Sequence, residues 1–357
     1  MAHFYPLTIT DLTRDTRDAV VLTLEPPANV ADKFKFIQGQ YLTFRHEFEG
    51  EELRRSYSIC AGINDNRLRV GIKKVDGGWF STWANEDLSI GDTLESMVPN
   101  GKFYAPLEPE KQKTYLAFAG GSGITPMISI IKTVMQEEPN ARLTLVYGNR
   151  ATNTIMFKEE LNDIKDEYLE RFSIVHILEH DAGEIDLFNG WVDKEKCDQL
   201  LENWLHLGEV DTAFICGPEP MMLAIAESLK QHGLAKDKIK FELFKSSPPK
   251  KARAKSLETN PDGKTIEATV IIDGISRTFN MPARGTSVLE AAKAEKIDVP
   301  FSCQAGVCST CSAKVTKGQV EMENNHGLED YEVDRGIVLT CQSYPLTDKI
   351  TIDYDQQ

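Results

Sequence analysis

Four cysteines near the C-terminus constrain the fold of this chain more than any other feature. Four residues separate Cys303 from Cys308, two separate Cys308 from Cys311, and Cys341 follows after a long gap. Plant-type ferredoxins bind a [2Fe–2S] cluster through cysteines at this spacing. Zinc is the alternative, but zinc sites usually combine two separated cysteine pairs, or cysteine with histidine, and here only Cys308 and Cys311 form such a pair.

The residues around these cysteines predict a small α+β domain. Gly306, inside the cysteine loop, can take a positive φ and let backbone N–H groups approach the cluster sulfurs. Ser287 and Glu290 have the spacing of a capping box at the start of a helix. The predicted strands are Thr265–Ile272, Arg277–Met281, Ser312–Thr316 and Lys349–Asp353. We therefore predict a ferredoxin domain of the β-grasp type over residues 265–357.

Length and charge limit what the rest of the chain can be. A chain of 357 residues suggests two or three domains, and a formal charge of −15 argues against a nucleic-acid partner. No apolar run is long enough to span a membrane and no secretory or targeting signal is evident, so we expect a cytoplasmic protein without a membrane partner or a disulfide framework. Residues 246–264 combine prolines, serines and basic residues, which predicts an exposed linker rather than a docking site.

Residues 110–245 alternate between strand and helix patterns. Such alternation predicts an α/β domain with a parallel sheet that helices cover on both faces. The predicted strands are Tyr115–Ala119, Leu143–Tyr147, Arg171–Leu178, Thr212–Cys216 and Ile239–Phe244, and the predicted helices begin at Thr125, at Phe157 and at Pro220.

A glycine-rich turn, Gly120–Pro126, follows the first of these strands. Glycines allow a close backbone approach, and the helix that follows offers unpaired N–H groups to a pyrophosphate. The turn departs from the usual dinucleotide fingerprint in its spacing, so an ordinary loop is the alternative. The second strand ends in Tyr147–Arg150, where an arginine suits a 2′-phosphate. This arginine favours NADPH over NADH, unless Arg150 is only a surface charge.

Residues 1–109 contain short strands punctuated by glycines and predict a small antiparallel β-barrel. In the strand that ends at Ser58, alternation places Arg55 and Tyr57 on one face and Ser58 on the other. Farther along, Gly77–Ser81 predicts the start of a short helix whose N-terminus can face a phosphate. Each of these two stretches can also be an ordinary strand or turn.

In this order the motifs resemble one family. The chain is similar to ferredoxin–NADP reductase-type flavoproteins fused to a C-terminal plant-type ferredoxin domain, through residues 51–60, 147–150, 214–218 and the cysteines. The resemblance implies an FAD-binding barrel over residues 1–109, an NAD(P)-binding domain over 110–245 and a [2Fe–2S] domain at the C-terminus. Some related reductases use FMN in the same domain order.

The resemblance also implies roles for residues at the flavin. The arginine matching Arg55 pairs with the phosphates of the flavin nucleotide, the tyrosine matching Tyr57 packs on the flavin ring, and Ser58 lies near flavin N5. Gly78 and Ser81 match a second phosphate-binding stretch.

Further matches concern the nicotinamide nucleotide. Those for its pyrophosphate are Gly121, Gly123 and Thr125, and those beside its ring are Cys216, Gly217 and Pro218. Glu242 and Phe244 match an acidic-x-aromatic terminus whose aromatic ring covers the flavin, although Phe244 can instead be a core residue. With Ser58 and Cys216, Glu242 completes the predicted catalytic group. Cys60, Cys197 and the seven histidines match no functional position.

These parts predict an electron-transfer enzyme. Nicotinamide releases two electrons together, a [2Fe–2S] cluster accepts one, and a flavin can do both. The resemblance implies that electrons pass from NADPH, or NADH, through FAD and the cluster to an oxygenase component, and it is most specific to reductases that serve the di-iron ring 1,2-epoxidases of phenylacetate degradation. Related reductases serve Rieske-type oxygenases, including steroid hydroxylases. A redox sensor is the alternative from another functional class.

The charge of the C-terminal domain indicates how the oxygenase component docks. From residue 265 onward, fourteen acidic residues stand against eight basic ones. We therefore expect a recipient with a basic surface, docking near the loop from Cys303 to Cys311.

Overall fold

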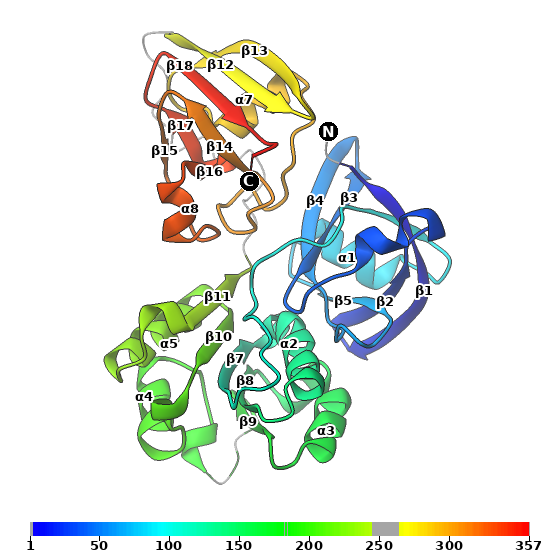
Figure 1. Cartoon of the computed structure of the whole chain (residues 1–357). Helices are drawn as coiled ribbons and strands as arrows, with labels where there is room; N and C mark the ends of the chain where they lie inside the picture. Colours follow the sequence, from blue (N-terminus) through cyan, green and yellow to red (C-terminus); the bar gives the residue numbers. More distant parts are fainter. Residues whose placement is uncertain (1–2, 182, 184, 245–263, 357) are drawn as a thin grey trace. The chain divides into compact units, whose positions relative to one another are not determined.

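The computed structural model describes residues 3–181, 183, 185–244 and 264–356, coloured along the sequence in Figure 1. The described residues form two compact units, and the larger comprises Tyr5–Leu53 and Tyr57–Phe244. The smaller contains the C-terminal residues from Lys264 onward, together with two short pieces, 3–4 and 54–56. The predicted linker 246–264 lies outside the described residues except for Lys264. Among the helices described, none has the length and apolarity required to cross a membrane.

The first half of the larger unit is an antiparallel sheet of six strands. In spatial order they are β4 (Glu51–Ser58), β3 (Tyr41–Phe48), β6 (Thr93–Ser96), β1 (Tyr5–Thr16), β2 (Ala19–Glu25) and β5 (Leu68–Lys73). An antiparallel bridge between Ile59 and Val70 joins the two edge strands, and the sheet closes into a barrel. Inward-facing residues such as Leu7, Leu22 and Phe44 are fully buried in its core. Helix α1 (Trp79–Glu86) follows β5, as predicted.

The second half is a parallel sheet of five strands. Their spatial order is β11 (Ile239–Leu243), β10 (Thr212–Gly217), β7 (Thr114–Gly120), β8 (Arg142–Asn149) and β9 (Phe172–Leu178). Helices α2 (Ile124–Glu137) and α3 (Lys158–Glu167) cover one face, and α4 (Lys194–Asn203) and α5 (Glu219–Gln231) cover the other (Figure 1). Because the chain order reverses between β7 and β10, a crevice for a ligand is expected where these two strands end.

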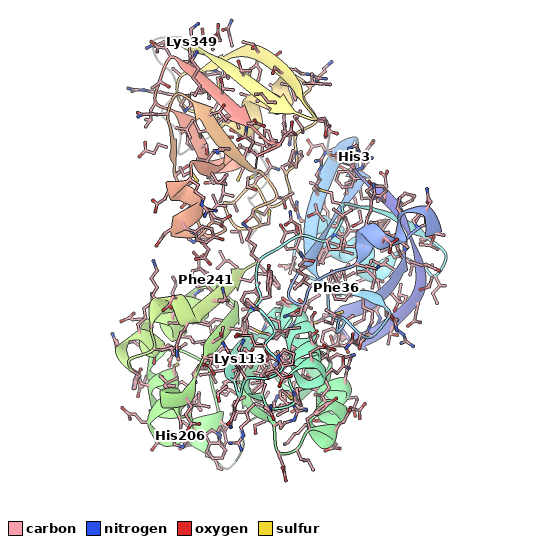
Figure 2. All side chains as sticks on the ribbon, viewed as in Figure 1. His3, Phe36, Lys113, His206, Phe241 and Lys349 are labelled. Atoms are coloured by element: carbon pink, nitrogen blue, oxygen red, sulfur yellow. The ribbon has the colours of Figure 1, made fainter. Side chains whose placement is uncertain are left out.

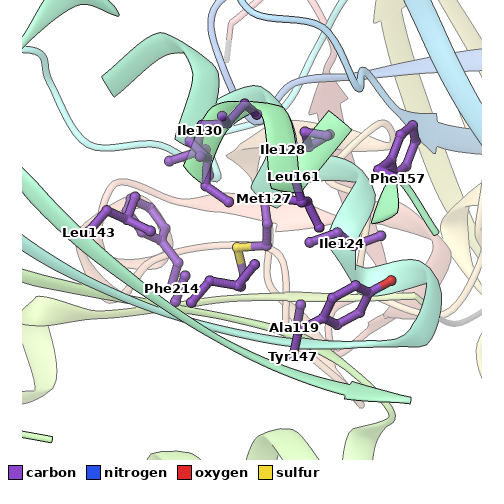
Figure 3. Close-up of a cluster of buried hydrophobic side chains, with 14 of the residues drawn as sticks. Ala119, Ile124, Met127, Ile128, Ile130, Leu143, Tyr147, Phe157, Leu161 and Phe214 are labelled. Atoms are coloured by element: carbon purple, nitrogen blue, oxygen red, sulfur yellow. The ribbon is translucent and has the colours of Figure 1, made fainter. Parts of the chain in front are cut away.

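Apolar side chains fasten α2 to this sheet. Ile124, Met127 and Ile128 are fully buried beside Tyr147 and Phe214 from the strands (Figure 3). This packing fixes the N-terminus of α2 at the carboxyl ends of β7 and β10, where the glycine turn lies.

The C-terminal unit contains a mixed sheet of five strands. They are β13 (Ile275–Pro282), β12 (Thr265–Ile272), β18 (Lys349–Asp353), β14 (Ser312–Lys317) and β16 (Ile337–Leu339), and β12 and β18 pair in parallel. Helix α7 (Val288–Ala294) begins with the predicted capping box, in which Ser287 Oγ accepts from Glu290 N. Strands β15 (Val320–Met322) and β17 (Ser343–Pro345) form a separate pair, and α8 (Asp330–Asp334) precedes β16.

Short 3-10 helices complete the described elements. They are η1 (Ala28–Phe34), η2 (Gly121–Gly123), η3 (Thr152–Thr154), η4 (Asp186–Phe188), η5 (Leu207–Glu209), η6 (Lys236–Lys238) and η7 (Thr340–Gln342).

Candidate functional site

The four C-terminal cysteines come together as two pairs. The thiols of Cys303 and Cys308 hydrogen-bond to each other, and so do those of Cys311 and Cys341. All four thiols are free of disulfides. In a [2Fe–2S] cluster four cysteine thiolates serve two irons, so two adjacent pairs fit such a cluster.

Backbone N–H groups surround these sulfurs. Ala305 N and Cys308 N each lie 3.4 Å from Cys303 Sγ. The hydrogen bond from Cys308, with those from the backbone, lowers the pKa of Cys303 to about 6. Gly306 has φ +76°, and a Cβ there would lie 2.7 Å from Asn324 O, so the loop requires glycine at this position. The backbone N–H groups directed at Cys303 Sγ therefore favour the thiolate of this cysteine, the form that binds iron.

A second group of predicted residues meets at the reversal point of the parallel sheet. Cys216, near the end of β10, pairs in register with Glu242 of β11. Ser58, near the end of barrel strand β4, donates from Oγ to Glu242 Oε2 at 3.1 Å. The structure thus brings the three predicted catalytic residues together from the barrel and the sheet.

Burial controls the ionisation of this group. Although part of the Glu242 residue remains accessible, burial of its carboxyl group raises its pKa to about 8, against the lowering effect of the hydrogen bond from Ser58. Burial, and then the nearby charge of Glu242, raise the pKa of Cys216 well above its usual range. At neutral pH both side chains are therefore predominantly uncharged.

The glycine turn lies directly beside Cys216. Gly121 has φ +52°, and a Cβ on Gly123 would lie 2.1 Å from the Cys216 carbonyl oxygen. Gly123, at the N-cap of α2, has no side chain to cap the helix, and the Ile124 N–H donates to Gly121 O and Ser122 O within the turn. The start of a helix that no side chain caps is a candidate site for an anion. Thr125 is buried and donates from Oγ1 to Ser122 O at 3.0 Å, so its hydroxyl holds the turn itself.

Two basic side chains come together near this turn. Arg150 is exposed immediately after β8, and Lys73 lies at the end of barrel strand β5. A Cβ on Gly121 would lie 3.6 Å from Lys73 Nζ. Burial and the positive charge of Arg150 lower the pKa of Lys73. Sequence reasoning identified Arg150 but missed Lys73, because only the fold brings this barrel lysine to the turn.

Strand β4 carries the residues predicted to contact a flavin. Tyr57 is half-buried, with its ring 5.6 Å from that of Phe80 and 6.3 Å from that of Phe44. Arg55 is also half-buried and donates from one guanidinium nitrogen to Arg54 O at 2.8 Å. The strand thus presents a partly open aromatic ring and an arginine within a few residues of Ser58.

The start of α1 forms a second anion-binding candidate. Gly78 precedes the helix, and no side chain caps its first N–H groups. A Cβ on Gly78 would lie 2.4 Å from Val75 Cγ2 and 2.6 Å from Ser81 Oγ, so a larger residue would displace these two side chains. Ser81 Oγ accepts from Val75 N and donates to Gly78 O, and these bonds fix the loop before the helix.

The sequence left two roles open for Phe244, at the end of β11: an aromatic ring that covers the flavin, or a buried core residue. Phe244 is 45% exposed, so the alternative in which it is a core residue of the last strand is wrong. Phe241 is 47% exposed on the same edge strand (Figure 2). Strand β10 ends at Gly217, and Pro218 then precedes α5. A Cβ on Gly217 would lie 3.0 Å from Gly120 N of the neighbouring strand β7.

Three family models match the chain. They describe an oxidoreductase FAD-binding domain over residues 6–104, an oxidoreductase NAD-binding domain over residues 118–227 and a 2Fe-2S iron-sulfur cluster binding domain over residues 270–346. These matches support FAD, a nicotinamide nucleotide and a [2Fe–2S] cluster as the cofactors.

Individual proteins match over almost the whole chain. One subunit of the 1,2-phenylacetyl-CoA epoxidase from Escherichia coli is 40% identical, covering 99% of both chains. The ferredoxin reductase component of 3-ketosteroid-9-alpha-monooxygenase from Rhodococcus rhodochrous is 31% identical, covering 98% of this chain and 96% of its own. The structure of phthalate dioxygenase reductase matches with TM-score 0.60 and 25% identity over 98% of both chains. The predicted fold class, a flavin barrel, an α/β nucleotide domain and a ferredoxin domain, is confirmed.

Proposed function

The chain belongs to the family of flavin- and iron–sulfur-containing reductase components of multicomponent oxygenases, and from this premise we propose that it delivers electrons from NADPH to a phenylacetyl-CoA ring 1,2-epoxidase with a di-iron centre. Similarity to reductase components of oxygenases supports electron delivery rather than the redox-sensor alternative. In our proposal residues 1–109 hold FAD, residues 110–245 hold the nucleotide, residues 246–264 connect them to the cluster domain, and residues 265–357 hold the cluster.

One observation carries the reductase chemistry. The hydrogen bond between Ser58 and Glu242 joins the barrel strand to the nucleotide-binding edge, within one strand pair of Cys216. FAD held here would supply the change from two-electron hydride chemistry to single-electron transfer. In this proposal Ser58 would hydrogen-bond near flavin N5, and the neutral Glu242 and Cys216 would keep the nicotinamide side of the site uncharged. The exposed ring of Phe244 would cover the flavin and would have to move aside for the nicotinamide.

The nucleotides are held by backbone and cations. Arg55 pairs with the FAD phosphates, Tyr57 packs on the flavin ring, and the start of α1 at Gly78 and Ser81 offers N–H groups to a flavin phosphate. For the nicotinamide nucleotide, the turn with Gly121 and Gly123 receives the pyrophosphate, Thr125 holds that turn, and Gly217 and Pro218 border the ring. Lys73 and Arg150 add positive charge, and Arg150 supports NADPH over NADH because it can pair with a 2′-phosphate.

The cluster domain carries the proposed docking surface. Cys303, Cys308, Cys311 and Cys341 hold the cluster. The acidic segment, defined as residues 320–335, contains six acidic residues and one arginine, so it accounts for most of the net charge of the domain. It contacts the cluster loop, since His326 N donates to Gly306 O at 2.9 Å. We therefore place the oxygenase, through a basic surface, on the acidic segment.

An anaerobic titration tests the electron route. NADPH and NADH are added in parallel, and reduction of flavin and cluster is followed by optical and EPR spectroscopy. We expect NADPH to reduce the flavin and the cluster at a lower concentration than NADH does. Cys308→Ser should abolish the cluster signal and acceptor reduction while sparing flavin reduction. Loss of flavin reduction in this variant would show that the assigned order is wrong.

Reconstitution tests the client. The reduced protein is mixed with a di-iron phenylacetyl-CoA epoxidase component or with a Rieske-type oxygenase component, and product formation is measured. We expect turnover with the epoxidase. The 3-ketosteroid-9-alpha-monooxygenase relative motivates the Rieske alternative. Turnover with the Rieske-type component, and none with the epoxidase, would favour that alternative.

A further inference from the structure

Helix α2, which begins at the nucleotide turn, is fastened to the barrel along one face. Ser129 Oγ donates to Ala61 O at 2.7 Å, and Ile63 N donates to Thr133 Oγ1 at 3.2 Å. Positions 129, 132 and 133 share a face of the helix because three- and four-residue spacings bring side chains together. The barrel segment that they contact follows β4 within a few residues. The helix is thus joined to the same stretch of chain that carries the proposed flavin-facing serine.

Glu160, in the first turn of α3, connects three elements at this junction. Its carboxylate accepts from both terminal nitrogens of Arg69 on β5, at 3.1 and 3.2 Å, and from Lys132 Nζ on α2 at 2.9 Å. Lys132 also pairs with Asp65 at 2.5 Å. The side chains of Arg69, Lys132 and Glu160 are only 16–25% exposed, so water screens these pairs less than it screens surface ion pairs.

Phe157 locks the entry into α3 at the same place. It has φ +56°, a conformation that costs energy for a bulky residue and therefore needs support from its surroundings. Its N–H donates to the Asp15 carboxylate of β1 at 3.1 and 3.2 Å. A Cβ on Gly71 of β5 would lie 3.1 Å from the tip of the Phe157 ring, so the absent side chain leaves room for close packing.

The charges at this junction balance around Glu160. Burial raises the pKa of Glu160, but the charge of Arg69 and the hydrogen bond from Lys132 outweigh this effect and leave the pKa below its ordinary value. Glu160 therefore stays ionised at neutral pH. Its removal would leave two half-buried cations competing for Asp65.

We propose that Glu160 is a positioning residue for hydride transfer, which fixes α2 and its nucleotide turn relative to the flavin-bearing barrel. The inference rests on the proposed function. Glu160 touches neither nucleotide in this proposal and acts through Arg69 and Lys132 alone. Hydride transfer requires the donor and acceptor atoms in near contact, and a displacement of about 1 Å can cost on the order of a hundredfold in rate.

Glu160→Gln in the flavin- and cluster-loaded protein tests this proposal. The matched control is Glu159→Gln, on the exposed side of the same helical turn. Stopped-flow flavin reduction by NADPH gives the hydride-transfer rate and the NADPH Kd. In the same traces, the transient charge-transfer absorbance between NADPH and the oxidised flavin reports how the nicotinamide is held against the flavin. Amide hydrogen exchange is measured on both flavin-loaded variants in the absence of NADPH and NADP⁺. Glu160→Gln should lower the rate by about tenfold and weaken the absorbance, with flavin content and Kd changed less than twofold.

Each outcome decides the question. Hydrogen exchange at 157–161 should be faster in Glu160→Gln than in the control, and equal exchange would overturn the proposal. A rate within twofold of the parent, or a rate loss matched by an equal loss of NADPH affinity, would also overturn it. If Glu160→Gln does not retain its flavin, Arg69→Lys is measured instead. An unchanged hydride-transfer rate in Arg69→Lys would then overturn the proposal. Failure of the proposed function differs, because the parent itself would then not be reduced by NADPH.

Discussion

Folding raises the pKa of Glu242, and this change can be measured through the pH dependence of stability. Burial raises its pKa from 4.5 to about 8 in the folded protein. Between these values the unfolded carboxyl is ionised and the folded one is still neutral, so the stability of the folded state falls as pH rises through this window. Glu242→Gln cannot ionise. We therefore expect the melting temperature of Glu242→Gln relative to the parent to increase from pH 5 to pH 8 and then level off.

Thermal denaturation of the flavin-loaded protein at several pH values measures this difference. Exposed Glu170→Gln on the same unit is the control and should follow the parent at every pH. Parallel curves for Glu242→Gln and the parent would mean that Glu242 has an ordinary pKa in the fold.

Single residues were predictable from sequence where the chemistry requires a local spacing. Three of the four cysteines lie within nine residues of one another, so their spacing alone indicated the cluster. Lys73 was not predictable, because it meets Arg150 only after the barrel packs on the parallel sheet. Phe244 allowed two interpretations from sequence, since an aromatic residue at a strand end can be buried or exposed, and the structure excludes the buried one.

At the scale of elements, the contact between α2 and β10 depends on Gly123. A methyl group there would lie 2.1 Å from the Cys216 carbonyl oxygen, and backbone must then move. Gly123→Ala should therefore push the nucleotide turn away from Cys216, destabilise the protein by about 1–3 kcal/mol and weaken NADPH binding by about tenfold or more. Difference absorbance titration and thermal denaturation measure the two effects. Gly208→Ala is the control, since no atom lies within 4 Å of a Cβ at that position. Equal NADPH affinity in the two variants would contradict the expectation.

Elements were predictable where apolar periodicity is strong. Buried runs such as Tyr115–Ala119 and the apolar face of α2 gave strands and a helix within a few residues of their observed bounds. The second half of barrel strand β1, up to Thr16, was not predictable, because pairing with β2 holds polar residues that carry no apolar pattern. Helix α8 has five residues, mostly acidic, and was missed for the same reason. The left-handed Phe157 has no signal in its residue type, since tertiary contacts impose its conformation.

At the scale of the whole molecule, the negative charge of the acidic segment predicts where the oxygenase component docks. The acidic segment carries six acidic residues against one arginine, beside the loop of Cys303 and Cys308. If a basic oxygenase surface docks there, raising ionic strength from about 0.01 to 0.15 M shortens the screening length from about 30 to 8 Å and slows association. Glu323→Gln with Asp334→Asn should slow electron delivery several-fold at low salt and flatten its salt dependence.

Stopped-flow oxidation of the reduced cluster by the oxygenase component, over a range of salt, measures this dependence. The control is a double variant with the same change of charge elsewhere in the cluster domain, Glu295→Gln with Asp348→Asn, at exposed positions outside the acidic segment. It should keep the parent's slope if the position of the charge matters, because screened attraction acts only over short distances. Equal slopes for both double variants would mean that total charge alone steers the partner, and a rate independent of salt in the parent would remove the electrostatic docking model altogether.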